Sequence, residues 1–158
     1  MKIHLATDHA GLELKDKIKL HLTELGHEVI DHGAHEYDAL DDYPDFIFPC
    51  AKAVAQDDQS RGIILGGSGQ GEAMAANRIK GIRAAVYYNG PEEIIELSRQ
   101  HNNANILSLG ARFMSEKEIY RIIEIWFDTD FEAGRHQRRI NNCLLYTSDA
   151  ADDTPCVD

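Results

Sequence analysis

Apolar residues follow two different spacings along the chain, and the two spacings alternate from the N-terminus to about Asn142. Five short apolar runs have the length of strands, and they lie at residues 2–6, 27–31, 62–65, 82–87 and 105–109. Between these runs apolar residues recur at helical spacing, as Leu14, Ile18 and Leu22 do, which predicts amphipathic helices. The predicted helices cover about residues 12–25, 43–56, 72–78, 91–100, 115–127 and 130–142.

Residues at the ends of these segments support the assignment. Gly26 directly follows the first predicted helix, where a glycine is typical, and Pro44 lies in the first turn of the second. Ser115 stands three residues before Glu118, which is the spacing of a capping box. Strands that alternate with helices predict a parallel sheet covered on both faces. We therefore expect one α/β domain, a three-layer α/β/α sandwich with a five-stranded parallel sheet of Rossmann or flavodoxin type.

Composition and charge exclude several classes of partner. The chain has 158 residues, of which 43% are hydrophobic and 27% charged, and 16 Lys+Arg against 27 Asp+Glu give a net charge of −11. Such acidity disfavours binding to nucleic acid or to an anionic membrane, since both favour a basic surface. No apolar stretch approaches the ~18 residues of a membrane span, and the N-terminus lacks the pattern of a secretory signal. We expect a cytoplasmic protein that binds neither nucleic acid nor membrane.

The segment 143–158, CLLYTSDAADDTPCVD, differs from the rest of the chain. It contains four Asp, no Lys or Arg, and two of the three cysteines, while residues 1–142 carry 16 basic and 23 acidic residues, a charge of −7. The cysteines form no CxxC pair and predict neither a disulfide scaffold nor a metal site. Composition indicates a disordered acidic tail, and its first residues resemble the in-frame translation of a sequencing-library adapter. We expect a folded domain over 1–142 and a non-native tail over 143–158; a natural acidic tail is the alternative.

Polar residues that suit chemistry cluster beside three of the predicted strands. Asp8 and His9 follow the first strand, a glycine loop with Glu72 follows the third, and His101 and Asn102 come just before the fifth. Ligands of parallel sheets bind at the carboxyl ends of the strands. We therefore expect the three clusters to form one site on neighbouring strand ends.

The loop from Gly66 to Gly71 is the most informative of these clusters. Four glycines in six residues, between a buried strand and a helix, allow successive backbone N–H groups to point at one anion. The spacing differs from GxGxxG, the next strand ends in Tyr87-Tyr88-Asn89 without an acidic residue, and no Lys follows as in a P-loop. The loop therefore favours a small anion over a dinucleotide, and a tight turn without a ligand is the alternative.

Several single residues allow both a functional and a structural interpretation. Glu72 holds an ordinary capping position, but beside the backbone donors of the loop it is placed to abstract a proton next to a carbonyl. Arg135 and Arg139 share one face of a predicted helix, which suits phosphate binding or a solvated basic face. His27 and His32 are one residue too far apart for HExxH and lie on a strand and a loop, so we expect no zinc site.

Five motifs occur in order over residues 2 to about 142. They are Asp8-His9-Ala10-Gly11, Asp42-Tyr43-Pro44-Asp45, GGSGQGEAMAAN at 66–77, His101-Asn102-Asn103-Ala104-Asn105 and Arg135-His136-Gln137-Arg138-Arg139. Together they resemble the ribose-5-phosphate isomerase B family of sugar-phosphate isomerases. The resemblance implies Rossmann-like subunits that form homodimers or tetramers, with active sites at the dimer interface and no metal or organic cofactor.

The resemblance also implies an activity and a set of roles. The domain 1–142 is expected to interconvert D-ribose 5-phosphate and D-ribulose 5-phosphate, a step of the pentose phosphate pathway, through a cis-enediolate. One branch of the family has a cysteine base at the position of Gly66, but this chain carries Glu72, the base of the other branch. His101 is assigned to opening of the furanose ring and Ser68 to the oxyanion. The implied substrate-binding residues are Asp8, His9, Tyr43, Gly67, Gly69, Gly71, Asn102, Arg112, Arg135 and Arg139.

Two other functions stay open on the sequence alone. Related enzymes isomerise hexose phosphates such as galactose 6-phosphate or allose 6-phosphate, and the choice depends on the shape of the pocket. A domain of this fold could also bind a phosphorylated metabolite without catalysis. An isomerase requires Glu72, His101 and the glycine loop to meet in one cavity, whereas a non-catalytic binding domain does not.

Overall fold

A single sheet of five parallel strands forms the centre of the computed structural model, which describes the backbone of residues 1–149 and the side chains of residues 1–143. The strands are β1 (Lys2–Thr7), β2 (Glu28–Asp31), β3 (Arg61–Gly66), β4 (Ala84–Tyr87) and β5 (Ile106–Gly110). Their order in the sheet is β2-β1-β3-β5-β4, and every neighbouring pair is parallel. All five predicted strands are confirmed, with boundaries shifted by one or two residues at most.

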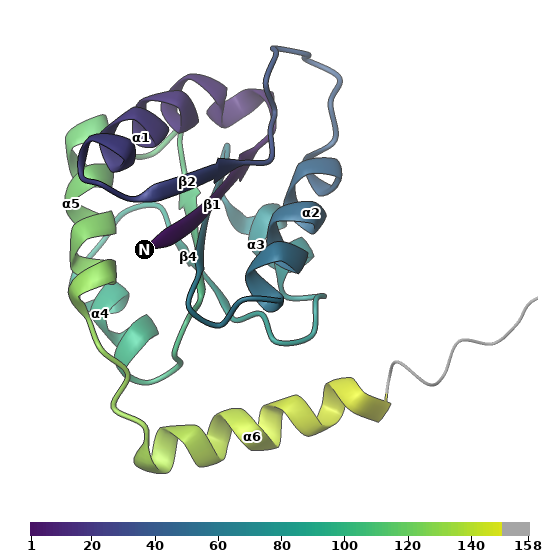
Figure 1. The fold of residues 1–158 in the computed structure, drawn as a ribbon, viewed down its shortest axis with the longest axis vertical. Coiled ribbons are helices and arrows are strands. Elements are labelled where there is room, and N and C mark those ends of the chain that lie inside the picture. The colour runs from purple at the N-terminus through teal and green to yellow at the C-terminus, as the bar shows by residue number, and fades with distance from the viewer. Residues whose placement is uncertain (150–158) are drawn as a thin grey trace, which may run out of the picture.

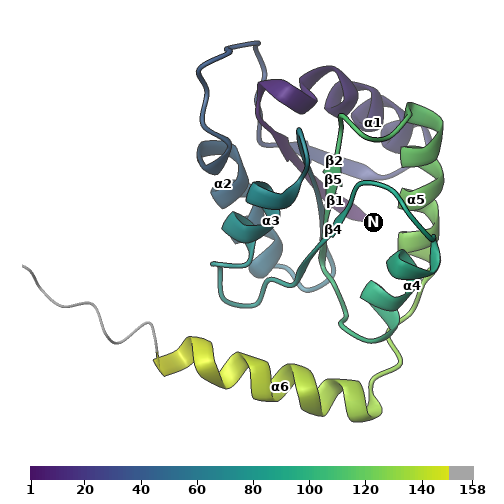
Figure 2. The same ribbon diagram turned by 180° about the vertical axis from the view of Figure 1, so that it is seen from behind.

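Helices cover both faces of this sheet (Figures 1 and 2). They are α1 (Leu12–Glu24), α2 (Tyr43–Ala55), α3 (Gln70–Ala76), α4 (Glu93–Gln100), α5 (Glu116–Asp128) and α6 (Gly134–Asp149), with a short 3-10 helix η1 (His9–Gly11) before α1. Alternate residues of each strand point to opposite faces, so Ile3 and Leu5 pack with α1, α4 and α5, while Ala6 and Ile64 pack with α2 and α3. The expected three-layer α/β/α sandwich is confirmed.

Helix α6 extends away from the sandwich, as Figures 1 and 2 show in yellow. It begins four residues later than the helix predicted from Asp130, and it continues past Asn142 to Asp149. Of the α6 side chains up to Cys143, only that of His136 is buried. Residues 150–158, the greater part of the predicted tail, lie outside the described residues. Among the helices described, none is long and apolar enough to cross a membrane.

Capping interactions define the start of α5 and the end of α1, and an ion pair neutralises one buried lysine. Ser115 and Glu118 form the predicted capping box at the start of α5, and Gly26 adopts a left-handed φ of 85° after α1. The fully buried Lys15 of α1 donates a hydrogen bond of 2.6 Å to the carboxylate of Asp31 at the end of β2. The same carboxylate accepts a hydrogen bond from the Gly33 amide, so α1 is tied to β2 by a satisfied buried ion pair.

Candidate active site

The predicted site residues divide into two groups at opposite edges of the sheet. In the parallel pairing of β3 with β5, Gly62 lies beside Ile106 and Gly66 beside Gly110. The loop after Gly66 therefore lies at the carboxyl edge of the sheet, whereas His101, which precedes Ile106, lies at the amino edge. The expectation that all the clusters share one edge is wrong within one chain, because residues that come before a parallel strand lie at its amino end.

We call the first set the carboxyl-edge group. It comprises Asp8, His9, Tyr43, Gly67, Ser68, Gly69, Gly71, Glu72 and Arg112. The second set, the amino-edge group, comprises His101, Asn102, Arg135 and Arg139.

The glycine loop is shaped by close contacts that only glycine permits. Gly69 has a φ of 75° and begins α3, and a Cβ there would lie 2.9 Å from the Leu109 carbonyl carbon. A Cβ on Gly71 would lie 2.9 Å from the Tyr43 ring, and one on Gly67 3.1 Å from the Arg112 guanidinium. Tyr43 and Arg112 therefore pack directly on the loop, as the predicted roles require.

The carboxyl group of Glu72 lies against the start of this loop. The residue is only 5% exposed, and a Cβ on Gly66 would overlap its carboxyl atoms. Burial raises the pKa of Glu72, a hydrogen bond from its own amide opposes the shift, and the negative charge of Asp8 adds to it. A buried carboxylate with a raised pKa, beside a loop of backbone N–H donors, is typical of a general base.

A pair of aspartates orders the segment around His9. Asp8 Oδ1 accepts a hydrogen bond of 2.9 Å from the Ala10 amide and so caps η1. Asp41 Oδ1 accepts bonds from His9 Nδ1 at 2.5 Å and from the His9 amide at 3.2 Å. The bond to Asp41 raises the pKa of His9, while partial burial and the charge of Arg112 oppose the shift. The contact with Asp41 thus favours the imidazolium form of His9 and leaves its Nε2 for an anionic or hydroxyl ligand.

Asp41 is a site residue that the sequence did not reveal. It lies in the polar loop between β2 and α2, just before the Asp42-Tyr43-Pro44-Asp45 motif, and no periodicity or motif includes it. Only the folded loop brings its carboxylate to the His9 ring.

Three residues of the amino-edge group line a cavity of about 640 Å³, while Arg135 lies on α6 outside its lining. His101 stacks on His136 of α6, with ring centroids 4.1 Å apart and planes at 11°. Glu132 Oε2 lies 3.9 Å from His101 Nε2 and 3.6 Å from His136 Nε2. Asn102 and Arg139 also line the cavity. The structure therefore brings His101, Asn102 and Arg139 together, but it does not bring them to Glu72 in the same chain.

Two clusters of side chains in the described part of the chain have the geometry to hold a metal ion. Each offers three ligand atoms within 4.8 Å of one another, and the clusters are Asp8, His9 and Asp41, and His101, Glu132 and His136. Neither cluster contains His27 or His32. In both, hydrogen bonds or close ion pairs already join the side chains, so their arrangement has an explanation without a metal.

Comparisons with known proteins find similar sequences and structures. Residues 3–143 match the ribose/galactose isomerase family. Ribose-5-phosphate isomerase B of Mycolicibacterium paratuberculosis is 44% identical over 147 residues, which are 92% of this chain and 91% of that protein. A crystal structure of ribose-5-phosphate isomerase B from Mycoplasma genitalium with bound ribulose-5-phosphate is 42% identical, with a TM-score of 0.88 over 93% of this chain and 96% of the other. A Clostridium thermocellum ribose-5-phosphate isomerase B is 39% identical, with a TM-score of 0.88 over 95% and 99% of the two chains.

Proposed function

Since the chain belongs to the ribose/galactose isomerase family, we propose that it interconverts D-ribose 5-phosphate and D-ribulose 5-phosphate at a site shared by two subunits. The reaction is that of its relatives, which are similar along nearly their whole length. The observation that carries the assignment to residues is the buried Glu72 carboxylate beside the glycine loop. This pairing of a base with an oxyanion site is what an aldose–ketose isomerisation requires.

Glu72 moves the proton in this proposal. In the open-chain aldose it takes the proton from C2, and the electrons of the C–H bond form the enediolate while charge develops on O1. Backbone N–H groups of the loop, with the Ser68 hydroxyl, stabilise that oxyanion. Return of the proton to C1, with transfer of the O2 proton to O1, gives the ketose. The raised pKa of Glu72 brings its basicity closer to what this transfer needs.

The charged residues of the carboxyl-edge group hold the substrate. Asp8 and Tyr43 face the sugar hydroxyls, and the His9 imidazolium with the Arg112 guanidinium binds hydroxyl or phosphate oxygens. Bidentate bonds from a guanidinium to a phosphate are among the strongest hydrogen bonds in proteins. The net acidity of the chain disfavours nucleic acids and anionic membranes but is compatible with a small phosphorylated sugar.

A second subunit supplies the rest of the site. Glu72 and His101 lie at opposite edges of one sheet, so a sugar bound at Glu72 is out of reach of His101 in the same chain. We propose a homodimer in which the amino-edge group of one subunit faces the carboxyl-edge group of its partner. His101 then opens the furanose ring, Asn102 contacts the enediolate, and Arg135 and Arg139 of the protruding α6 bind the phosphate. Such dimers could pair into tetramers, and we place the enzyme in the cytoplasm and in the pentose phosphate pathway.

The experiment is a coupled assay that measures ribulose 5-phosphate formed from ribose 5-phosphate. Glu72→Gln should keep KM and lower kcat by about 10²–10⁴, the usual loss on removing a general base. Glu93→Gln, an exposed glutamate of α4, is the matched control and should leave kcat unchanged. Equal kcat for Glu72→Gln and wild type would remove Glu72 from the reaction.

The same assay distinguishes pentose from hexose substrates. The kcat/KM for ribose 5-phosphate should exceed that for allose 6-phosphate and galactose 6-phosphate. The reverse order would assign the chain to hexose phosphates while leaving the role of Glu72 intact.

A further inference from the structure

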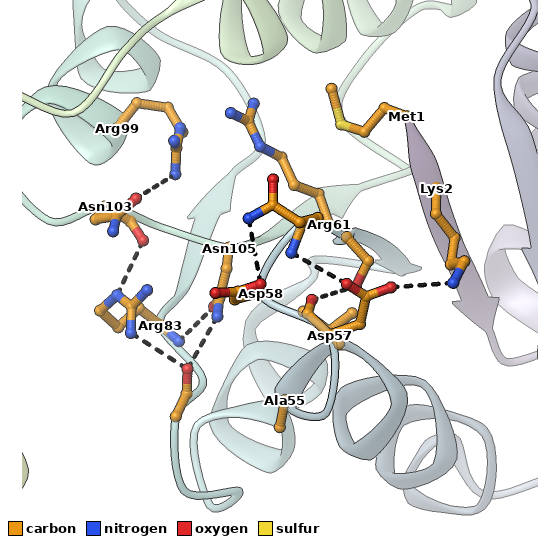
Figure 3. Close-up of a pocket in the computed structure, with 14 residues that line it drawn as sticks. Met1, Lys2, Ala55, Asp57, Asp58, Arg61, Arg83, Arg99, Asn103 and Asn105 are labelled. Carbon is orange, nitrogen blue, oxygen red and sulfur yellow. Dashed lines mark hydrogen bonds and ion pairs between the residues drawn. The ribbon is translucent and has the colours of Figure 1, made fainter.

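A second polar cavity opens at the amino edge of the sheet (Figure 3). Its volume is about 890 Å³, and its walls come from the amino ends of β1, β3, β4 and β5 together with the ends of α2 and α4. No residue of the carboxyl-edge or amino-edge group lines it. Arg83 also borders the cavity around His101, but the other lining residues have no role in the proposed isomerase site.

Three arginines from different elements converge on this cavity. Arg61 begins β3, Arg83 precedes β4, and Arg99 lies in the last turn of α4. Arg61 and Arg99 both lie close to the Trp126 ring, with guanidinium carbons 5.3 and 5.8 Å from its centroid. Arg99 itself is only 6% exposed. Packing against the Trp126 ring holds the flexible side chains of Arg61 and Arg99 in place.

Hydrogen bonds hold the three guanidiniums but do not neutralise them. Arg99 Nη1 donates to Asn103 Oδ1 and to the Ala104 carbonyl, and Arg83 Nε donates to the Asn103 carbonyl. Figure 3 shows Asn103 between Arg99 and Arg83. Arg61 Nη1 donates to the carbonyls at 126 and 127. All these acceptors are uncharged amide oxygens, so three positive charges stay close together.

Within the described part of the chain, no carboxylate lies within ion-pair distance of these arginines, and their Nη2 groups have no hydrogen-bond partner. None of these Nη2 atoms is fully buried, so solvent reaches them. Burial lowers the pKa of Arg99 to about 10, repulsion from Arg61 and Arg83 adds to the shift, and the negative charge of Asp130 opposes it. Asp57 and Asp58 also line the cavity, but neither forms an ion pair with the three arginines, so the charged guanidiniums can donate their Nη2 hydrogens to a bound anion.

We propose that this cavity binds a condensed phosphate group, a diphosphate or longer, through Arg61, Arg83 and Arg99. Guanidinium N–H groups donate charge-assisted hydrogen bonds to phosphate oxygens. Three unpaired Nη2 groups around one cavity provide six N–H donors, more than one phosphate oxygen face can accept, which favours two or more linked phosphates. The amide groups of Asn103 and Asn105 supply neutral polar contacts on the same wall.

The test is calorimetric titration of the full-length protein with inorganic pyrophosphate in the presence of saturating ribose 5-phosphate and ribulose 5-phosphate at equilibrium. The sugar phosphates occupy the proposed isomerase site, so pyrophosphate must bind elsewhere. Wild type should bind one pyrophosphate per chain, and Arg83→Gln should weaken that binding by about tenfold or more because one guanidinium is lost. Arg78→Gln removes an exposed arginine outside the cavity and should leave the affinity within about twofold.

Asp58→Asn provides an opposite and gentler change. Asp58 is exposed and lines the cavity, so removing its negative charge should tighten pyrophosphate binding by about two- to fivefold without disturbing the core. Asp58→Asn therefore tests pyrophosphate binding in this cavity even if Arg83→Gln does not fold. Absence of binding in the presence of the sugar phosphates, equal affinities for Arg83→Gln and wild type, or an affinity unchanged by Asp58→Asn would each overturn the proposal.

Discussion

Replacing Gly66 with alanine places a methyl group where the Glu72 carboxylate now lies. The alanine Cβ would overlap all three atoms of that carboxyl group, which must retreat to a contact distance of at least 3.4 Å. The atoms in its way are the end of a flexible side chain rather than backbone. The base is therefore displaced by more than about 1 Å while the strand and loop keep their paths.

The magnitude follows from how strongly proton transfer depends on position. A misplacement of about 1 Å in a catalytic group costs about 10²-fold in rate, which equals about 2.7 kcal/mol of transition-state stabilisation. We expect Gly66→Ala to lower kcat by about 10² in the coupled ribulose 5-phosphate assay, with KM within about threefold of wild type. Its Tm should stay close to that of wild type, because the overlap is relieved by the Glu72 side chain.

A double-mutant cycle separates displacement of the base from general damage. Glu72→Asp shortens the side chain and withdraws the carboxylate from Gly66, so the two substitutions should be strongly non-additive. The reasoning is refuted if Gly66→Ala has wild-type kcat, or if the two losses simply multiply. A cysteine at this position would likewise fill the space that the Glu72 carboxylate occupies in this chain.

Three further changes test other parts of the structure. Asp31→Asn leaves the buried Lys15 without its main partner and should cost about 3 kcal/mol of unfolding free energy, seen as a Tm about 10 °C lower; a Tm within about 2 °C of wild type would contradict this. Asp41→Asn removes the charged acceptor that raises the pKa of His9, so the imidazolium is lost at lower pH and the alkaline limb of kcat/KM should move toward lower pH. An unmoved limb would show that Asp41 does not set the pKa of His9. Arg139→Ala should raise KM for the phosphorylated sugar with kcat largely kept. Unchanged kinetics would mean that Arg139 is a solvent-exposed residue without a role in phosphate binding.

The sequence was sufficient to predict the layers of the fold because strand and helix leave different apolar spacings. Each predicted strand is present, and the Ser115 capping box lies where its spacing places it. The order of the strands was not predictable in the same way, since β5 lies between β3 and β4 and no local pattern records which strands are neighbours. The charged Lys15 was also missed, because its burial depends on a partner sixteen residues away.

The candidate site was predictable only in part, for a related reason. The carboxyl-edge group follows strands directly, so strand polarity alone brings Asp8 and Glu72 to one edge. His101 comes before its strand, and its position relative to Glu72 depends on which edge of a subunit meets which edge of the next. Asp41 reaches His9 only through the path of a loop, and loops have no periodicity from which their path can be read.

The sharing of one active site by two subunits is tested most directly by mixing two inactive variants. Glu72→Gln and His101→Asn are each expected to be nearly inactive alone, because every site in either homodimer lacks one of the two groups. Co-refolding them in equal amounts gives about half mixed dimers, each with one site that has both native groups, so the mixture should recover about a quarter of the wild-type kcat. Activity no higher than the average of the two variants would show that Glu72 and His101 do not meet across subunits, and would contradict the proposed site.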